Sequence, residues 1–133
     1  MDTGSEKFKK SERLCSKKII ASLIDEGDAF FMPLFKVVWL KNPASLPSPA
    51  QVAFSVPKKG FRNAVTRNLL KRRMRESYRK NKYLLYEQLE HSGICIAFII
   101  SFRHNSIASY SEIEKAMIEV LERLVSVAAK SRK

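Results

Sequence analysis

The chain has 133 residues, 45% of them hydrophobic, which is enough for one ordinary core and too little for two independent ones. Its 25 Lys and Arg stand against 13 Asp and Glu, and the resulting net charge of +12 predicts a polyanionic partner. No apolar run approaches the roughly 20 residues that span a bilayer, and the first ten residues lack the apolar stretch of a secretory signal. We therefore expect a cytoplasmic protein with no membrane partner, made of a flexible segment over residues 1–10 and one domain over residues 11–130.

The first half of the chain is predicted to form one helix and two or three strands. The helix should start near Ser11 and end at Gly27, because apolar residues recur there at near-helical spacing. These residues are Leu14, Ile20, Leu23 and Ile24. Residues 35–40 are rich in aromatic and β-branched side chains and predict a strand, with a possible short strand before Pro33. Residues 51–56 alternate between apolar and smaller side chains, as a half-buried strand does.

The second half is predicted to form two helices around a buried strand. Residues 63–82 are helix-like, and residues 94–100 are apolar on both faces, which indicates a strand in the middle of a sheet. The final segment is predicted to be an amphipathic helix that packs on the sheet. Its apolar positions are Ile113, Ala116, Met117, Val120, Leu121, Leu124 and Val125.

The positive charge is concentrated in the predicted helix over residues 63–82 and the residue before it. Between Arg62 and Lys82 the chain has nine basic residues and one acidic residue, Glu76, so two thirds of the net charge lie in 21 residues. The basic residues are Arg62, Arg67, Lys71, Arg72, Arg73, Arg75, Arg79, Lys80 and Lys82. Such a crowd of like charges needs screening by solvent or neutralisation by a polyanion. A solvated charged face is the alternative, but the near absence of acids favours contact with RNA or DNA.

This helix has two distinct sides when residues are placed at about 100° intervals. One side is expected to be buried and carries Leu70, Met74, Ser77 and Tyr78. The opposite side carries Asn68, Arg72, Arg75 and Arg79, with Arg67 and Lys71 on the flank between them. Six of the nine basic residues are arginines, which favours planar, bidentate contacts with phosphates.

Two stretches of sequence resemble a known family. The first is Ser55-Val56-Pro57-Lys58-Lys59, and the second runs from Arg62 to Arg79 as Arg-Asn-Ala-Val-Thr-Arg-Asn-Leu-Leu-Lys-Arg-Arg-Met-Arg-Glu-Ser-Tyr-Arg. Together they resemble the pattern of the bacterial ribonuclease P protein subunit: a strand ending in Ser-Lys-Lys, then Asn-Ala-Val, a spacer residue and Arg-Asn-Arg. The match in residue type and spacing covers about 25 residues, and the order of predicted elements is similar along nearly the whole chain.

The sequence departs from the family pattern at a few positions. Leu69 stands in place of the second Arg of the Arg-Asn-Arg triplet, Pro57 stands in place of a usual Ser, and the loop after Lys59 is one residue longer than in some relatives. Either Arg72 or Arg73 is expected to supply the RNA contact that Leu69 lacks.

The resemblance implies an α+β fold with a single domain. The fold would be an α/β sandwich with the order α-β-β-β-α-β-α and a left-handed β-α-β crossover through the basic helix, the opposite of the usual hand. The resemblance also implies that the protein is a subunit of a ribonucleoprotein endonuclease, which removes the 5′ leader from precursor tRNA.

Two RNA-binding surfaces are implied by the resemblance, one for the ribonuclease P RNA and one for the leader of precursor tRNA. The residues expected to bind the RNA subunit are Arg62, Asn63, Arg67, Asn68, Lys71, Arg72, Arg73, Arg75 and Arg79. A cleft between the first helix and the sheet would hold the leader as a single strand, through stacking and backbone attraction. The residues expected there are Leu14, Lys18, Phe54, Ser55, Lys58 and Lys59. No protein partner is identifiable.

No protein active site is predicted. Hydrolysis of a phosphodiester by protein side chains needs clustered carboxylates for metal ions or a pair of histidines. The chain has three aspartates, its glutamates lie mainly on amphipathic helices, and His91 and His104 fall in apparent loops. Cys15 and Cys95 have no Cys or His at metal-ligand spacing and are expected to be reduced, packed thiols. We therefore expect neither catalytic nor metal-binding protein residues, with Mg²⁺ held mainly by the RNA.

Two other functions compete with this prediction. A structural RNA-binding protein, such as a ribosomal protein, would have the same basic helix without a role in processing. A DNA-binding regulator is a weaker alternative, because its recognition helix would need a supporting helix in helix-turn-helix geometry. Strands are predicted to flank the basic helix instead.

Overall fold

A four-stranded sheet forms the centre of the computed structural model, which describes residues 7–43 and 46–130. The strands are β1 (Asp28–Phe31), β2 (Phe35–Lys41), β3 (Ala50–Ser55) and β4 (Ile96–Phe102), and their order in the sheet is β1-β2-β4-β3. β2 pairs antiparallel with β1 and β4, whereas β3 and β4 are parallel. β4 therefore lies between two other strands, and five of its seven residues are buried. The prediction of a central apolar strand is confirmed.

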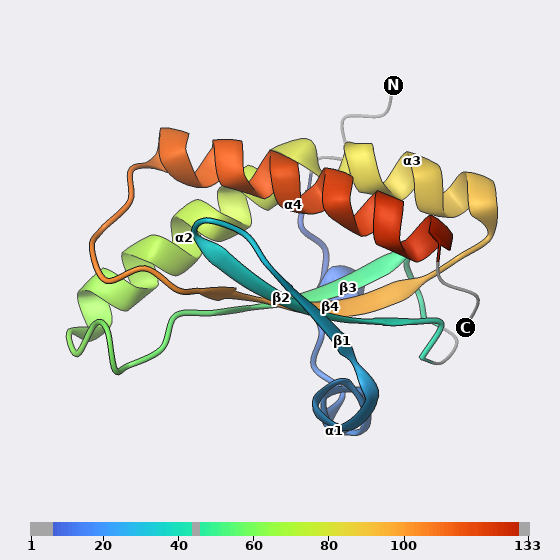
Figure 1. Ribbon diagram of the computed structural model, residues 1–133, viewed down its shortest axis with the longest axis horizontal. Coiled ribbons are helices and arrows are strands. Elements are labelled where there is room, and N and C mark those ends of the chain that lie inside the picture. The colour runs from blue at the N-terminus through green and yellow to red at the C-terminus, as the bar shows by residue number, and fades with distance from the viewer. Residues whose placement is uncertain (1–6, 44–45, 131–133) are drawn as a thin grey trace.

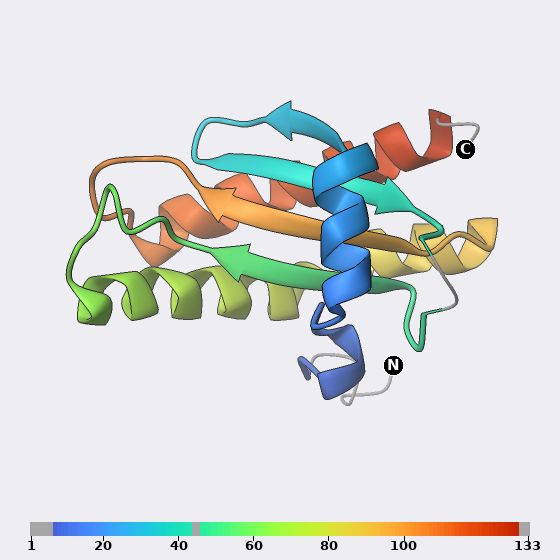
Figure 2. The ribbon, with the colours of Figure 1, turned by 90° about the horizontal axis from the view of Figure 1, so that it is seen from below.

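The two faces of the sheet are covered very differently. α2 (Ala64–Asn81), α3 (Tyr83–Ser92) and α4 (Tyr110–Lys130) lie on one face, and α1 (Lys17–Glu26) crosses the other (Figures 1 and 2). The larger core lies between the sheet and the three helices, and the smaller core under α1 is built from Leu14, Leu23 and Ala97. Most of the α1 face of the sheet thus has no helix over it. Within the described part of the chain, no helix is both long and apolar enough to cross a membrane.

The connection between the two parallel strands runs through α2 and α3. Figure 2 shows β3 and β4 pointing the same way, with α2 behind the sheet, and in this arrangement the crossover is left-handed. The α+β class and the order of elements are confirmed, with one α-helix more than the sequence predicted. α3 follows α2 after Lys82, and it ends at Gly93, whose φ of 68° is in the left-handed region that favours glycine. His91 lies in the last turn of α3 rather than in a loop.

The N-terminal part of the predicted first helix is not helical. A short 3₁₀ helix, η2, covers Lys10–Glu12, the next residues are extended, and α1 begins only at Lys17. Ser16 caps α1, because its Oγ accepts a hydrogen bond from the backbone N–H of Ile19 at 3.2 Å. The prediction of a helix from Ser11 is therefore wrong in its first turns.

Contacts with the rest of the domain hold this segment out of the helix. The backbone N–H of Leu14 donates to the carbonyl of Val52 at 3.0 Å, so residues 13–14 lie against the outer edge of β3. Within the segment expected to be flexible, residues 1–6 lie outside the described residues. Phe8 packs against Tyr78, with ring centroids 5.9 Å apart. The described end of that segment is thus part of the packed domain.

Candidate RNA interface

The orientation of α2 is fixed by a buried side that the sequence predicted. Leu70, Met74, Ser77 and Tyr78 are all 0% exposed, and they pack against the sheet and α4. Burial of these side chains makes the opposite side of α2 face solvent. Asn68, Arg72 and Arg75 are exposed there, as the helical spacing predicted.

Two residues at the start of α2 shape the loop that leads into it. Asn63 caps the helix, since its Oδ1 accepts a hydrogen bond from the N–H of Val65 at 2.8 Å. The Nη1 atom of Arg67 donates to the carbonyls of Phe61 and Arg62, at 2.7 and 2.9 Å. These two predicted RNA contacts therefore also position the loop that carries Lys58 and Lys59, and part of the Arg67 guanidinium is already bonded.

Two further arginines of α2 are engaged within the protein. Arg73 donates to the carbonyl of Ala108 at 2.5 Å and ties α2 to the segment before α4. Arg79 forms a bidentate pair with Glu76, at 3.0 and 2.8 Å, and the hydrogen bond from this guanidinium lowers the pKa of the Glu76 carboxyl. Glu76, the one acidic residue between Arg62 and Lys82, thus neutralises one of the nine basic residues there.

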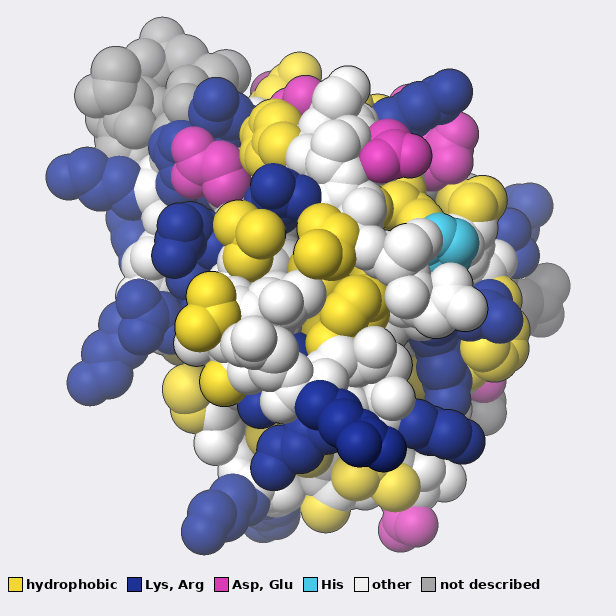
Figure 3. All heavy atoms as spheres, turned by 90° about the vertical axis from the view of Figure 1, so that its left-hand side faces the viewer, with side chains coloured by type: hydrophobic (Ala, Val, Ile, Leu, Met, Phe, Trp, Pro, Cys, Tyr) yellow, Lys and Arg dark blue, Asp and Glu magenta, His cyan; other side chains and the backbone are white. Residues whose placement is uncertain are grey.

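The remaining cations of the predicted set are available to a partner. Arg62, Lys71, Arg72 and Arg75 have no ion pair and no side-chain hydrogen bond within residues 7–43 and 46–130. In Figure 3, basic side chains line one edge and the lower part of the face formed by this end of the molecule, and they outnumber the acidic ones. Acidic side chains of the described residues therefore neutralise little of the positive charge on this surface.

The residues predicted to bind the leader do not form one cluster. Lys18 is exposed in the first turn of α1, and Lys58 and Lys59 are exposed after β3. Leu14 is only 6% exposed, and Phe54 is half-buried beside Tyr78, with ring centroids 5.7 Å apart.

Leu14 and Phe54 line a groove together with two cations of α2. The groove, which we call the edge groove, has a volume of about 420 Å³. Its lining residues are Phe8, Arg13, Leu14, Cys15, Val52, Ala53, Phe54, Lys71 and Arg75. The structure thus brings parts of the two predicted surfaces together.

Ser55 belongs instead to the open face of the sheet beside α1. Ser55 pairs in register with Ser101, and Ser101 pairs with Lys36, so the three side chains form a row across β3, β4 and β2. Ser101 and Lys36 line a second groove of about 360 Å³, which we call the sheet-face groove. Its lining residues are Leu23, Ile24, Gly27, Ala29, Lys36, Val38, Ile99 and Ser101. This groove matches the predicted location between the first helix and the sheet, but its lining contains none of the predicted leader residues.

The sequence did not predict several exposed residues on the α1 side of the sheet. Ile24 is 78% exposed, although its spacing placed it on the apolar side of the first helix. Phe31 is 57% exposed and lies beneath two cations, with Cζ of Arg103 4.5 Å and Nζ of Lys36 5.8 Å from its ring centroid. One feature of the sequence could have indicated these exposed residues. α1 and β1 contain more apolar residues than one side of a helix or strand can bury.

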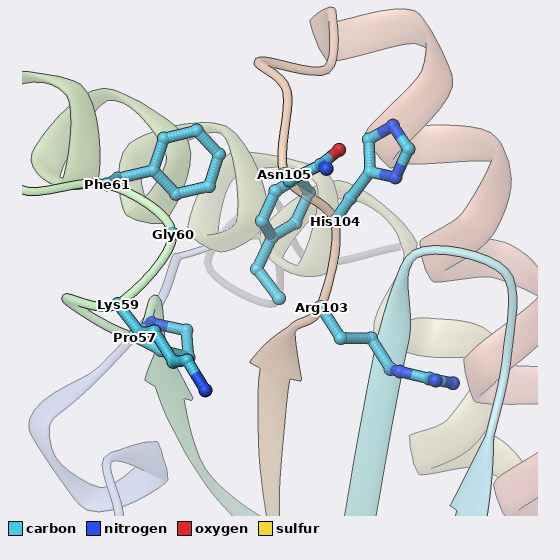
Figure 4. Close-up of a pocket in the computed structure, with 8 residues that line it drawn as sticks. Pro57, Lys59, Gly60, Phe61, Arg103, His104 and Asn105 are labelled. Atoms are coloured by element: carbon cyan, nitrogen blue, oxygen red, sulfur yellow. The ribbon is translucent and has the colours of Figure 1, made fainter.

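A third pocket opens at the carboxyl ends of β3 and β4. It has a volume of about 470 Å³ and lies between the loop around Lys59 and the chain that follows β4. Figure 4 shows the Phe61 ring pointing into the space between these segments, whereas the Arg103 guanidinium points away from it, toward β1 and β2. This pocket therefore presents aromatic surface with little converging positive charge.

The described residues do not fit a metal ion held by the protein. No group of three or more His, Cys, Asp or Glu side chains comes together among residues 7–43 and 46–130. A protein site for Mg²⁺ needs carboxylate oxygens, and no three of the described acidic side chains come together. We therefore assign no chemical step to a protein-bound metal.

Comparison with known proteins places the chain in one family. The sequence model of the family described as Ribonuclease P matches residues 8–125. The ribonuclease P protein component of Porphyromonas gingivalis (strain W83) is 34% identical over 115 residues, which are 86% of this chain and 84% of that protein. The corresponding protein of Chlorobium phaeobacteroides is 40% identical over 82 residues, covering 59% of this chain and 56% of that protein.

Solved structures share the fold. The RNase P proteins of Staphylococcus aureus and Thermotoga maritima both superpose with a TM-score of 0.67 at 21% identity and cover 84% of this chain. The matched parts are 94% and 96% of those two proteins. By the family match over most of its length and its similarity to these relatives, the chain belongs to the ribonuclease P protein component family.

Proposed function

We propose that this protein binds the catalytic RNA of ribonuclease P through the outward side of α2 and holds the 5′ leader of precursor tRNA on the open face of the sheet. In this role it supports endonucleolytic removal of the leader in the cytoplasm. The observation that carries the proposal is the set of exposed cations on α2, Arg72 and Arg75 above all, which have no acidic partner among the described residues.

The electrostatics of α2 favour a folded RNA as the partner. Lys71 and Arg75 are one helical turn apart, and Arg72 lies beside them, so the side chains match closely spaced phosphates better than isolated carboxylates. Neutralising phosphates releases counterions, so binding through this surface should depend steeply on salt. Burial of Leu70 and Met74 holds the helix in one orientation before the RNA arrives.

For the leader, the sheet-face groove has the properties that a sequence-tolerant site needs. Ile24 and Val38 offer apolar surface to bases, while the row of Ser55, Ser101 and Lys36 offers hydroxyl groups and a cation to the backbone. Lys58 and Lys59 follow Ser55 after two intervening residues and are exposed, which extends the positive charge beyond the groove.

The chemistry of cleavage is assigned to the RNA. No three His, Cys, Asp or Glu side chains come together among the described residues, which supports our proposal that the metal ions are bound by the RNA subunit. The contribution of the protein is then to neutralise phosphates and to position the leader. A structural RNA-binding protein with no processing role is the alternative.

Reconstitution tests the proposal directly. The purified protein should restore cleavage of a precursor tRNA by a bacterial ribonuclease P RNA at a low Mg²⁺ concentration at which that RNA alone is inactive. An established ribonuclease P protein serves as the positive control. If the control stimulates cleavage and this protein does not, the processing role is excluded and the structural alternative remains.

A second experiment separates the two surfaces. Arg72→Ala with Arg75→Ala should weaken binding to the RNA subunit, whereas Lys58→Ala with Lys59→Ala should reduce the preference for leader-bearing over leaderless tRNA. Ile24→Ser should act like the lysine pair without loss of stability, because the side chain is 78% exposed. The same effect from all three variants would contradict the two-surface proposal.

A further inference from the structure

The edge groove lies along a part of the sheet that has no neighbouring strand. β3 is the last strand in the order β1-β2-β4-β3, and its outer edge meets the described N-terminal segment in a single bridge, between Arg13 and Val52. Because the carbonyl of Val52 points to this edge and backbone groups alternate along a strand, the N–H and C=O of Phe54 point the same way. The groove therefore has a backbone donor and acceptor on one wall.

Positive charge surrounds the groove on two sides. Arg13 comes from the N-terminal segment, and Lys71 and Arg75 come from α2, while no acidic residue is among the residues that line the groove. None of these three side chains has an ion pair within the described parts of the chain. An anion in the groove would thus be met by cations that belong to two separate segments.

The floor of the groove is aromatic and rigid. The rings of Phe8 and Phe54 are tilted with centroids 5.9 Å apart, and both are partly exposed. Each also packs edge-on against the fully buried ring of Tyr78, at 5.9 and 5.7 Å. Cζ of Arg13 lies 5.9 Å from the centroid of the Phe8 ring. Rings held in this way lose little freedom when a planar ligand stacks on them.

We propose that the edge groove binds one unpaired nucleotide of the ribonuclease P RNA. The nucleobase stacks on Phe8 and Phe54, and Arg13, Lys71 and Arg75 contact its phosphates. This inference rests on the proposed function, because Lys71 and Arg75 belong to the surface assigned to that RNA. The site is separate from the one proposed for the leader, since the edge groove and the sheet-face groove share no lining residue.

Matched variants test the two kinds of contact. Arg13→Gln removes an exposed arginine that lies over a phenylalanine ring, and Arg123→Gln is its control, because Arg123 lies 5.2 Å from the Phe30 ring, outside the groove. The affinity of each full-length variant for a transcribed ribonuclease P RNA is measured at several salt concentrations. Arg13→Gln should weaken binding. It should also reduce the slope of log affinity against log salt concentration by about 1, the value for one lost phosphate contact. Equal effects of the two variants would overturn the proposal.

The stacking contact has a different signature. Phe8→Leu should weaken binding about tenfold and leave the salt dependence unchanged, since stacking on an aromatic ring involves no counterion release. Thermal unfolding is measured alongside to establish that the variant is folded. A folded Phe8→Leu protein with wild-type affinity would overturn the assignment of a nucleobase to the groove.

A probe in the wild-type protein makes the test independent of substitutions. Cys15 is exposed, not packed as the sequence predicted, and it lines the edge groove. Cys95 is half-buried near Asn42, outside the groove, and serves as an internal control. Saturating RNA should slow alkylation of Cys15 by iodoacetamide several-fold and leave Cys95 unchanged. If the RNA binds and Cys15 reacts as before, the groove proposal fails while the proposed function stands. If no ribonuclease P RNA binds, both fail, and protection by a leader oligonucleotide alone would overturn the assignment to the RNA subunit.

Discussion

The carboxylate of Glu12 lies 2.6 Å from Nζ of Lys82, and both side chains are almost completely buried, at 6% and 3% exposure. Lys82 also donates to the carbonyl of Lys7 and lies 5.4 Å from the Tyr86 ring centroid. The pair joins segments 70 residues apart and ties η2 to the junction of α2 and α3. It thereby holds Phe8 and Arg13, which both line the edge groove, in place.

Removing one partner of this pair should be costly. Glu12→Leu leaves a buried ammonium without its carboxylate and should lower the free energy of unfolding by about 3–5 kcal/mol in a urea titration. The double variant Glu12→Leu with Lys82→Met leaves no buried charge and should lose clearly less. A single variant that loses under about 1 kcal/mol, or a double variant as unstable as the single, would show that the pair does not have this role.

Gly27 should not tolerate even a methyl group. A Cβ at this position would lie 2.5 Å from the carbonyl oxygen of Leu23 and 2.9 Å from Cγ1 of Val38, where α1 meets the sheet. Gly27→Ala should therefore destabilise the protein by about 1–3 kcal/mol through overpacking. Gly60→Ala is the control, since the nearest atom to its Cβ would be 3.8 Å away. Similar unfolding midpoints for the two variants would contradict the close packing of α1.

The buried tyrosines predict a loss of stability in alkali. Burial raises the pKa of the Tyr78 phenol well above its ordinary value of 10.0, and burial raises the pKa of Tyr86 as well. The unfolded chain therefore releases these protons first. The stabilisation is fully present below pH 10 and declines as the pH rises above it. Each tyrosine contributes a slope of about 1.4 kcal/mol per pH unit in that range.

Tyr78→Phe tests this pH dependence. The free energy of unfolding should fall less steeply above pH 10 in the variant than in the wild type, because one of the two phenols is gone. Urea titrations over a series of pH values measure both slopes. Identical slopes would mean that Tyr78 ionises as readily in the folded state as in the unfolded one.

Glu76 should restrain RNA binding. It forms a bidentate pair with Arg79, so Glu76→Gln removes the negative charge that offsets this guanidinium on the RNA-binding side of α2. The variant should bind a ribonuclease P RNA several-fold more tightly, with a steeper salt dependence. Glu119→Gln, a change at an exposed position of α4, is the matched control. Weaker binding by Glu76→Gln than by Glu119→Gln would show that the pair helps to present Arg79 instead of withholding it.

The sequence predicted those features that depend on local periodicity. The burial of Leu70, Met74, Ser77 and Tyr78 follows from helical spacing alone, and the central place of β4 follows from an apolar run bounded by polar residues. The left-handed crossover was implied only by the family resemblance, because spacing along the chain carries no information about the hand of a connection.

The features that the sequence did not predict depend on contacts between distant segments. Glu12 and Lys82 are 70 residues apart, so nothing near Ser11 indicates that the chain must stay out of the helix there. Arg73 resembles every other cation of α2, yet the carbonyl of Ala108 engages it. α3 follows α2 after a single residue, and the hydrophobic pattern does not mark the break between them.

The affinity of the double variant Arg72→Gln with Arg75→Gln for a transcribed ribonuclease P RNA, measured across salt concentrations, tests the central claim most directly. The matched control is Lys115→Gln with Arg123→Gln, which removes two exposed cations from α4. The account predicts a large loss of affinity and a log–log salt slope smaller by about 1.5 in the α2 variant, with little change in the control. Equal affinity and slope in the two variants would contradict the assignment of α2 as the RNA-binding surface.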